Sequence, residues 1–103
     1  MTDTDVSLLT ASHFQPHVGS HFELRADDVL DVELLEVDDA DGRSGDPLRT
    51  ARAPFSIVFL GPRDPVLPQR IYRLEHDELG TLDLFLVPIG RDDAGVRYEA
   101  VFT

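Results

Sequence analysis

The stretch "QRIYRLEHDELGTLDLFLVPIG" (residues 69–90) decides the fold, because it reads as two β-strands joined by a turn. Each arm is a short run that contains the apolar, β-branched or aromatic residues that strands favour. The linker Asp77-Glu78-Leu79-Gly80 has the composition of a four-residue turn, in which Gly80 is suited to a positive φ angle. We therefore expect a β-hairpin with strands at 69–76 and 81–90.

Strand patterns continue on both sides of this hairpin. The other predicted strands are "HFELR" (21–25), "VLDVELLEV" (29–37), "FSIVFL" (55–60) and "VRYEAVFT" (96–103). At Leu34-Leu35 the alternation slips by one residue, and a β-bulge explains the slip because one extra residue flips every later side chain.

One short helix is expected before the first strand. Thr10 is a suitable N-cap for one or two helical turns, and Pro16 should end them. About six short strands and this helix predict an all-β fold, either a small antiparallel β-barrel or a sandwich. No internal repeat or low-complexity linker indicates a second domain, so residues 1–103 are expected to form a single β-domain.

The charge is strongly negative and unevenly distributed. The net charge is −11, from 20 acidic residues against nine arginines. Residues 1–46 hold twelve acids and two arginines, a net of −10, whereas residues 47–103 have a net of −1. So acidic a surface repels phosphate groups, which disfavours nucleic acids and anionic membranes as partners.

The sequence also lacks the marks of insertion or export. No apolar run reaches the ~20 residues that span a bilayer. The first ten residues, "MTDTDVSLLT", are acidic, whereas a secretory signal begins with positive charge. The expected location is therefore the cytoplasm.

The consecutive residues Glu75, His76, Asp77 and Glu78 raise the question of a catalytic or metal-binding corner. In a strand Glu75 and His76 point to opposite faces, and the next two residues belong to the turn. A metal ion needs three or four ligands that converge on one point. We therefore interpret this cluster as the tip of a hairpin.

Three histidines, His13, His17 and His21, are spaced four residues apart and would line one face of a continuous helix, where they could bind zinc. Pro16 and Gly19 lie between them and make such a helix improbable. We interpret them as surface or half-buried histidines beside phenylalanines of the core.

The loop 38–47, "DDADGRSGDP", suggests calcium through its four aspartates, Asp38, Asp39, Asp41 and Asp46. An EF-hand register with Gly42 at its sixth position places Val37 first and Leu48 twelfth, where acidic ligands are required, so the motif fails. A solvated acidic loop is the favoured interpretation, and a looser calcium site is the alternative.

Catalytic signatures are missing. The sequence has no G-x-S-x-G, P-loop, H-E-x-x-H or dinucleotide-binding motif. It has neither cysteine nor lysine, which removes two common nucleophiles and the Schiff-base route. We therefore assign no catalytic, cofactor-binding or metal-binding residue, and we expect a protein that is not an enzyme.

Two predicted strands, "FSIVFL" (55–60) and "LDLFLVPI" (82–89), carry large apolar residues on both faces. In "LDLFLVPI" (82–89), one face holds Leu82, Leu84 and Leu86, and the other holds Phe85, Val87 and Ile89. In a protein of this size the second face must be covered by the helix, a neighbouring sheet or another chain. Contact with a partner is therefore expected near 55–60, 84–89 or 96–103. Pro88 lacks a ladder donor and suits an edge or a bulge.

Several segments together resemble a family of short bacterial proteins that is classed as a domain of unknown function. The segments are "LTASHFQPHVG" (9–19), "RAPFSIVFLGP" (52–62), "LPQRIYRLEH" (67–76), "LG" (79–80), "LFLVPIG" (84–90) and "YEAVF" (98–102). The resemblance implies gene neighbours of the phage-tail-collar or microcystin-dependent tail-fibre type. It therefore implies a structural or assembly role, with a location in a phage-like particle as a second possibility, and it supplies no active-site residues.

Two hypotheses follow. The first is a non-enzymatic β-module that binds a protein partner, either a tail-fibre-like protein or a second copy of itself as a homo-oligomer. The second is a small metal- or ligand-binding β-barrel that uses the acidic loop 38–47 or the N-terminal histidines.

Overall fold

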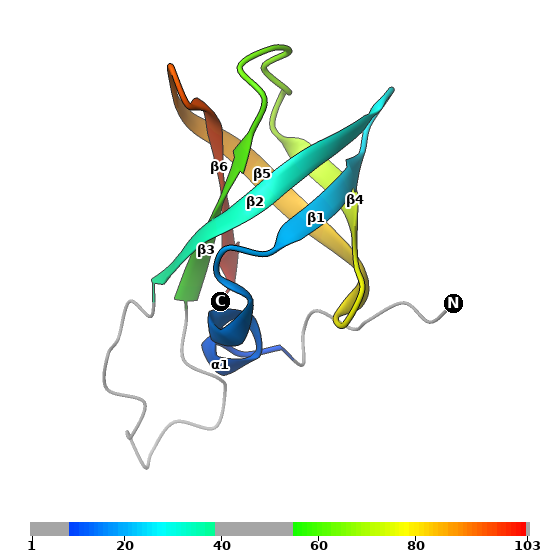
Figure 1. Ribbon diagram of the computed structural model, residues 1–103, viewed down its shortest axis with the longest axis vertical. Coiled ribbons are helices and arrows are strands. Elements are labelled where there is room, and N and C mark those ends of the chain that lie inside the picture. Colours follow the sequence, from blue (N-terminus) through cyan, green and yellow to red (C-terminus); the bar gives the residue numbers. More distant parts are fainter. Residues whose placement is uncertain (1–8, 39–54, 103) are drawn as a thin grey trace.

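The chain folds into a closed antiparallel β-barrel with a short helical segment at one end (Figure 1). The computed structural model describes residues 9–38 and 55–102. Its elements are α1 (Ala11–Phe14), the 3-10 helix η2 (Gln15–His17), β1 (His21–Arg25), β2 (Val29–Asp38), β3 (Phe55–Gly61), β4 (Arg70–His76), β5 (Gly80–Asp92) and β6 (Gly95–Phe102). The strand order is β1-β2-β3-β6-β5-β4, and β4 pairs back with β1. The predicted fold class is confirmed, and of the two predicted architectures the barrel is the one observed.

The barrel interior is filled by the apolar residues that alternate along each strand. In β1 the burial pattern strictly alternates, with Phe22 and Leu24 inside. At the end where α1 lies, Phe14 is fully buried, and its ring centroid is 6.0 Å from that of Phe55 and 5.5 Å from that of Phe102. The helical segment therefore closes this end of the core.

In the hairpin that decides the fold, β4 pairs with β5. The pairing runs from Arg70 opposite Leu86 to His76 opposite Gly80. Its turn is one residue shorter than predicted, because Gly80 pairs with His76 and leaves only residues 77–79 outside the strands. Gly80 has the expected positive φ, +79°, and a glycine in this conformation typically closes a three-residue hairpin loop.

The predicted bulge in β2 is confirmed. The register against β3 shifts between Leu34 and Glu36, so Leu35 is the extra residue. A second shift separates Pro88 from Gly90 in β5, which places Pro88 beside a bulge, as its missing donor suggests.

The prediction that Pro16 ends the helical backbone is wrong. Although α1 ends at Phe14, Pro16 lies at the start of η2, which continues to His17. Proline is tolerated there because the first residues of a helix have no intrahelical acceptor for their N–H groups. Among the described residues, no helix is long and apolar enough to cross a membrane.

Candidate functional site

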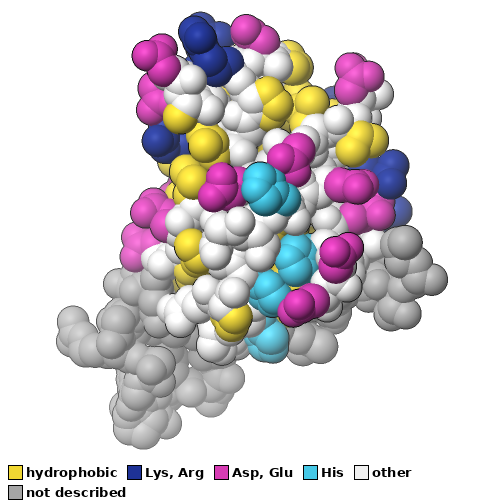
Figure 2. Space-filling view, viewed as in Figure 1, with side chains coloured by type: hydrophobic (Ala, Val, Ile, Leu, Met, Phe, Trp, Pro, Cys, Tyr) yellow, Lys and Arg dark blue, Asp and Glu magenta, His cyan; other side chains and the backbone are white. Residues whose placement is uncertain are grey.

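The outer surface of the barrel has two faces of different chemistry. The first, which we call the acidic face, is formed by β1 and β2. Its outward carboxylates are those of Glu23, Asp31, Glu33, Glu36 and Asp38. Figure 2 shows this face, on which acidic side chains surround a column of histidines.

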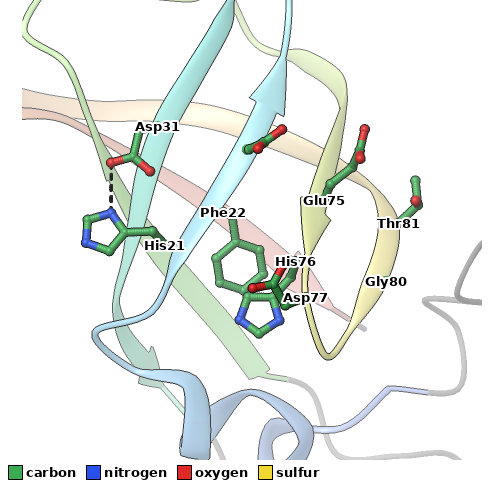
Figure 3. A pocket seen from close by; sticks show the side chains of 9 residues that line it. His21, Phe22, Asp31, Glu75, His76, Asp77, Gly80 and Thr81 are labelled. Carbon is green, nitrogen blue, oxygen red and sulfur yellow. Dashed lines mark hydrogen bonds and ion pairs between the residues drawn. The ribbon is translucent and has the colours of Figure 1, made fainter.

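A solvent-open groove of about 480 Å³ lies on this face, between β1, β2 and the β4–β5 turn (Figure 3). On one side His21 is hydrogen-bonded to Asp31, with Nδ1 and Oδ2 2.8 Å apart. On the other side lie Glu75 and Thr81, and the ring of His76 lies between the two sides (Figure 3). The groove is thus lined by several carboxylates and two imidazoles.

The N-terminal histidines and the cluster at residues 75–78 are separate in the sequence but come into contact at the end of the barrel where the β4–β5 turn lies. The rings of His17 and His76 are 4.7 Å apart and nearly perpendicular. His17 Nε2 lies 3.8 Å from a carboxylate oxygen of Glu78. His13 lies on α1, where its Nδ1 accepts a hydrogen bond from the backbone N–H of Thr10. The three histidines therefore share no helix face, as predicted, but the contact between His17 and the turn was not predicted.

His76 is more than part of a turn tip. Its Nδ1 accepts hydrogen bonds from the backbone N–H groups of Glu78 (3.0 Å) and Leu79 (3.1 Å), so the imidazole organises the turn. Its ring centroid lies 4.4 Å from that of Phe22. Burial lowers the pKa of His76 from its ordinary value of 6.5, and His17 lowers it further, whereas Glu78 and Asp77 act in the opposite direction. The folded protein therefore favours a neutral His76.

Glu75 diverges from His76, as strand alternation predicts. Its carboxylate pairs with the guanidinium of Arg25 across the β1–β4 junction. The raised pKa of Arg25 comes mainly from this hydrogen bond. Glu75 is therefore part of a cross-strand ion pair, and it shares no ligand set with His76.

No metal site is assembled within residues 9–38 and 55–102. In these ranges no three histidine or carboxylate side chains converge on a point where they could hold an ion. Asp38 ends β2, whereas Asp39, Asp41 and Asp46 of the proposed calcium loop lie outside the described residues. The calcium hypothesis for loop 38–47 therefore stays a prediction.

The second face, which we call the apolar face, is formed by the outer sides of β4, β5 and β6. Ile71 on β4 pairs directly with Phe85 on β5. The β5–β6 ladder ends at the pair Val87–Glu99, and Phe85 and Val101 each lie two residues beyond this pair on their own strands, on the outward side. The relative exposures of Ile71, Phe85 and Val101 are 65%, 51% and 63%. These three exposed side chains, on the outward side of three neighbouring strands, are hereafter called the apolar row.

Two of the three stretches near which contact is predicted contribute residues to this row, and the contact itself stays a prediction. Residues 84–89 and 96–103 contribute Phe85 and Val101, but 55–60 contributes little, because the outward Val58 is only 5% exposed. Val58 lies between Glu36 and Glu99 of the neighbouring strands, whose aliphatic stems can cover it. Ile71 was not predicted, although its place next to the inward Tyr72 is a signal that its side chain faces outward.

Fold and surface together define a small closed β-barrel with one acidic and one apolar outer face. The family model described as "Domain of unknown function (DUF6916)" matches residues 9–102. The chain belongs to this family, in agreement with the resemblance to a family of unknown function. No curated protein and no solved structure matches the chain.

Proposed function

We propose that this protein is a non-enzymatic structural or assembly protein that works by binding another protein through its apolar face. The observation that carries the proposal is the apolar row, in which Ile71, Phe85 and Val101 are each at least half exposed on three neighbouring strands, with Ile71 and Phe85 directly paired. Single exposed apolar residues are ordinary, but contiguous ones are typical of interaction surfaces.

The surroundings of the row support this proposal. Arg73 pairs with Asp83 at 3.2 Å, and Arg97 pairs with Asp92 at 2.5 Å, so paired charges flank the apolar centre. Interfaces commonly have such an apolar core with a polar rim. The acidic face would then maintain solubility and repel wrong partners by charge, while the apolar row supplies most of the affinity.

For the biological setting, we propose a phage-derived tail or fibre system, with a tail-fibre-like protein as the partner. This step rests on the family resemblance and on the gene neighbours that it implies. In this setting the protein is located in the cytoplasm before assembly or in a phage-like particle after it.

Light scattering tests the proposal directly. The purified chain is measured alone and then mixed with the purified product of each flanking gene. We expect a complex of defined mass in at least one of these samples. A chain that stays monomeric in all of them, and that converts a small molecule, contradicts the proposal.

A further inference from the structure

A single carboxylate stands next to the apolar row. Glu99 on β6 is half-buried, and its cross-strand neighbours are Val87 on β5 and Val58 on β3. Val101 follows two residues later, so its side chain leaves the strand on the same face as that of Glu99. The carboxylate of Glu99 therefore lies among aliphatic side chains, at the border of the surface that we propose for binding.

No positively charged side chain in the described part of the chain neutralises this carboxylate. On the same outer face, acids on β5 hold two arginines: Asp83 holds Arg73, and Asp92 holds Arg97, which comes two residues before Glu99. The hydrogen bond from Arg97 is also the main cause that lowers the pKa of Asp92. Glu99 has no comparable partner among the ion pairs of the described residues.

A partner that covers the apolar row would remove water from Glu99. A carboxylate that loses water without gaining a cation or a hydrogen-bond donor is strongly unfavourable. A second copy of this chain is a poor match, because Arg73 and Arg97 beside its own row are already paired with acids and each copy has a net charge of −11. A partner with a basic group avoids both problems.

We infer that the apolar face binds a different protein, one that presents an apolar surface with an arginine or lysine directed at Glu99. This inference rests on the proposed function and names the chemistry of its partner. Apolar contacts with the row supply affinity, and the ion pair with Glu99 supplies selectivity against neutral or acidic apolar surfaces.

The chemistry can be tested without knowing the partner. The ¹⁵N-labelled full chain is titrated with n-hexylguanidinium, which mimics an arginine on an apolar stem, and separately with n-hexanol, at constant ionic strength. We expect saturable amide shifts at Ile71, Phe85, Glu99 and Val101, with the guanidinium binding about fivefold more tightly than the alcohol, as one partly exposed ion pair allows.

Two matched variants locate the effect. Glu99→Gln should reduce the affinity for hexylguanidinium at the row to that for hexanol. Glu33→Gln is the control, because Glu33 is also a half-buried glutamate on the outside of the barrel, but it faces His21 and Leu60 instead of the row. An absence of saturable shifts at the row, or equal affinities in the wild type and Glu99→Gln, would overturn the inference.

Sedimentation equilibrium of the chain alone separates this inference from the proposed function. We expect a monomer at both low and high salt. A dimer that buries the apolar row would overturn the inference while the proposal of function by contact survives. Conversely, a failure to bind any protein would contradict the proposed function, and with it the inferred protein partner, even if hexylguanidinium binds through Glu99.

Discussion

The acidic face and the apolar face both enclose buried apolar side chains, but the chemistry of their outward side chains differs. Beneath the first, Leu24 and Val32 are fully buried, and beneath the second, Leu84 and Leu86 are at most 3% exposed. These inner positions form the core beneath both faces, whereas most outward side chains of the two faces stay at least partly exposed. The outer positions are therefore free to differ, and we attribute their difference to what each face meets in solution.

The largest effect should distinguish the inside from the outside of the apolar face. Leu84→Ala removes a buried side chain and should reduce the free energy of unfolding by about 3 kcal/mol. Phe85→Thr, at the next position, replaces a half-exposed ring by a residue that suits strands and should cost about 1 kcal/mol or less. Urea denaturation measures both. Equal losses would mean that Phe85 belongs to the core and that the apolar row serves folding.

A smaller effect concerns the dependence of folding stability on pH at the end of the acidic face where His76 lies. Because the folded state lowers the pKa of His76 below 6.5, the unfolded chain binds a proton more readily at this site. The stability that depends on neutral His76 is fully present above pH 6.5 and is lost as the pH falls through the lowered pKa. On the apolar face, Asp92 has a pKa lowered from 3.8 by Arg97, so its contribution is lost only below that pH.

Thermal unfolding as a function of pH resolves these two windows. His76→Asn keeps an acceptor for the turn but does not titrate, so it should flatten the change just below pH 6.5. His13→Asn, which replaces an exposed imidazole that also accepts a backbone hydrogen bond, is the control. An unchanged pH profile in His76→Asn would contradict the role that we give to this histidine.

The smallest effect is expected on the acidic face itself. Glu36→Gln changes the charge of an exposed side chain on β2, and surface substitutions of this kind usually change stability by less than about 0.5 kcal/mol. Relief of like-charge repulsion favours a slight gain at low salt. Urea denaturation at two salt concentrations measures the change. A loss above 1 kcal/mol would show that the acidic face contributes to folding after all.

Much of the fold could be predicted because its signals are local. Alternating or continuous apolar runs between turn residues located every described strand to within about two residues at each end, and the slip at Leu34-Leu35 correctly predicted the bulge. Closure of the barrel could not be predicted in the same way, because it depends on the pairing of β1 with β4, whose residues are about fifty positions apart. The choice between barrel and sandwich therefore stayed open.

Surface features were likewise predictable where they depend on one strand and unpredictable where they depend on several. The outward side of 84–89 could be predicted from the two-residue period of a strand, whereas the placement of Ile71, Phe85 and Val101 on neighbouring strands required the strand order of the barrel. The contact of His17 with His76 depends on how η2 meets the β4–β5 turn, and no local pattern encodes it. Properties of single strands could thus be predicted, but properties that arise between strands could not.

The most direct test of function by contact compares the two faces with one substitution. Val101 on the apolar row and Val29 on β2 are both more than half exposed, at 63% and 54%. Threonine has nearly the shape of valine and suits strands, so Val101→Thr and Val29→Thr should both fold. Light scattering with the partner identified among the flanking gene products should show that Val101→Thr weakens the complex and that Val29→Thr leaves it intact. Equal complex formation by both variants would contradict the assignment of binding to the apolar face.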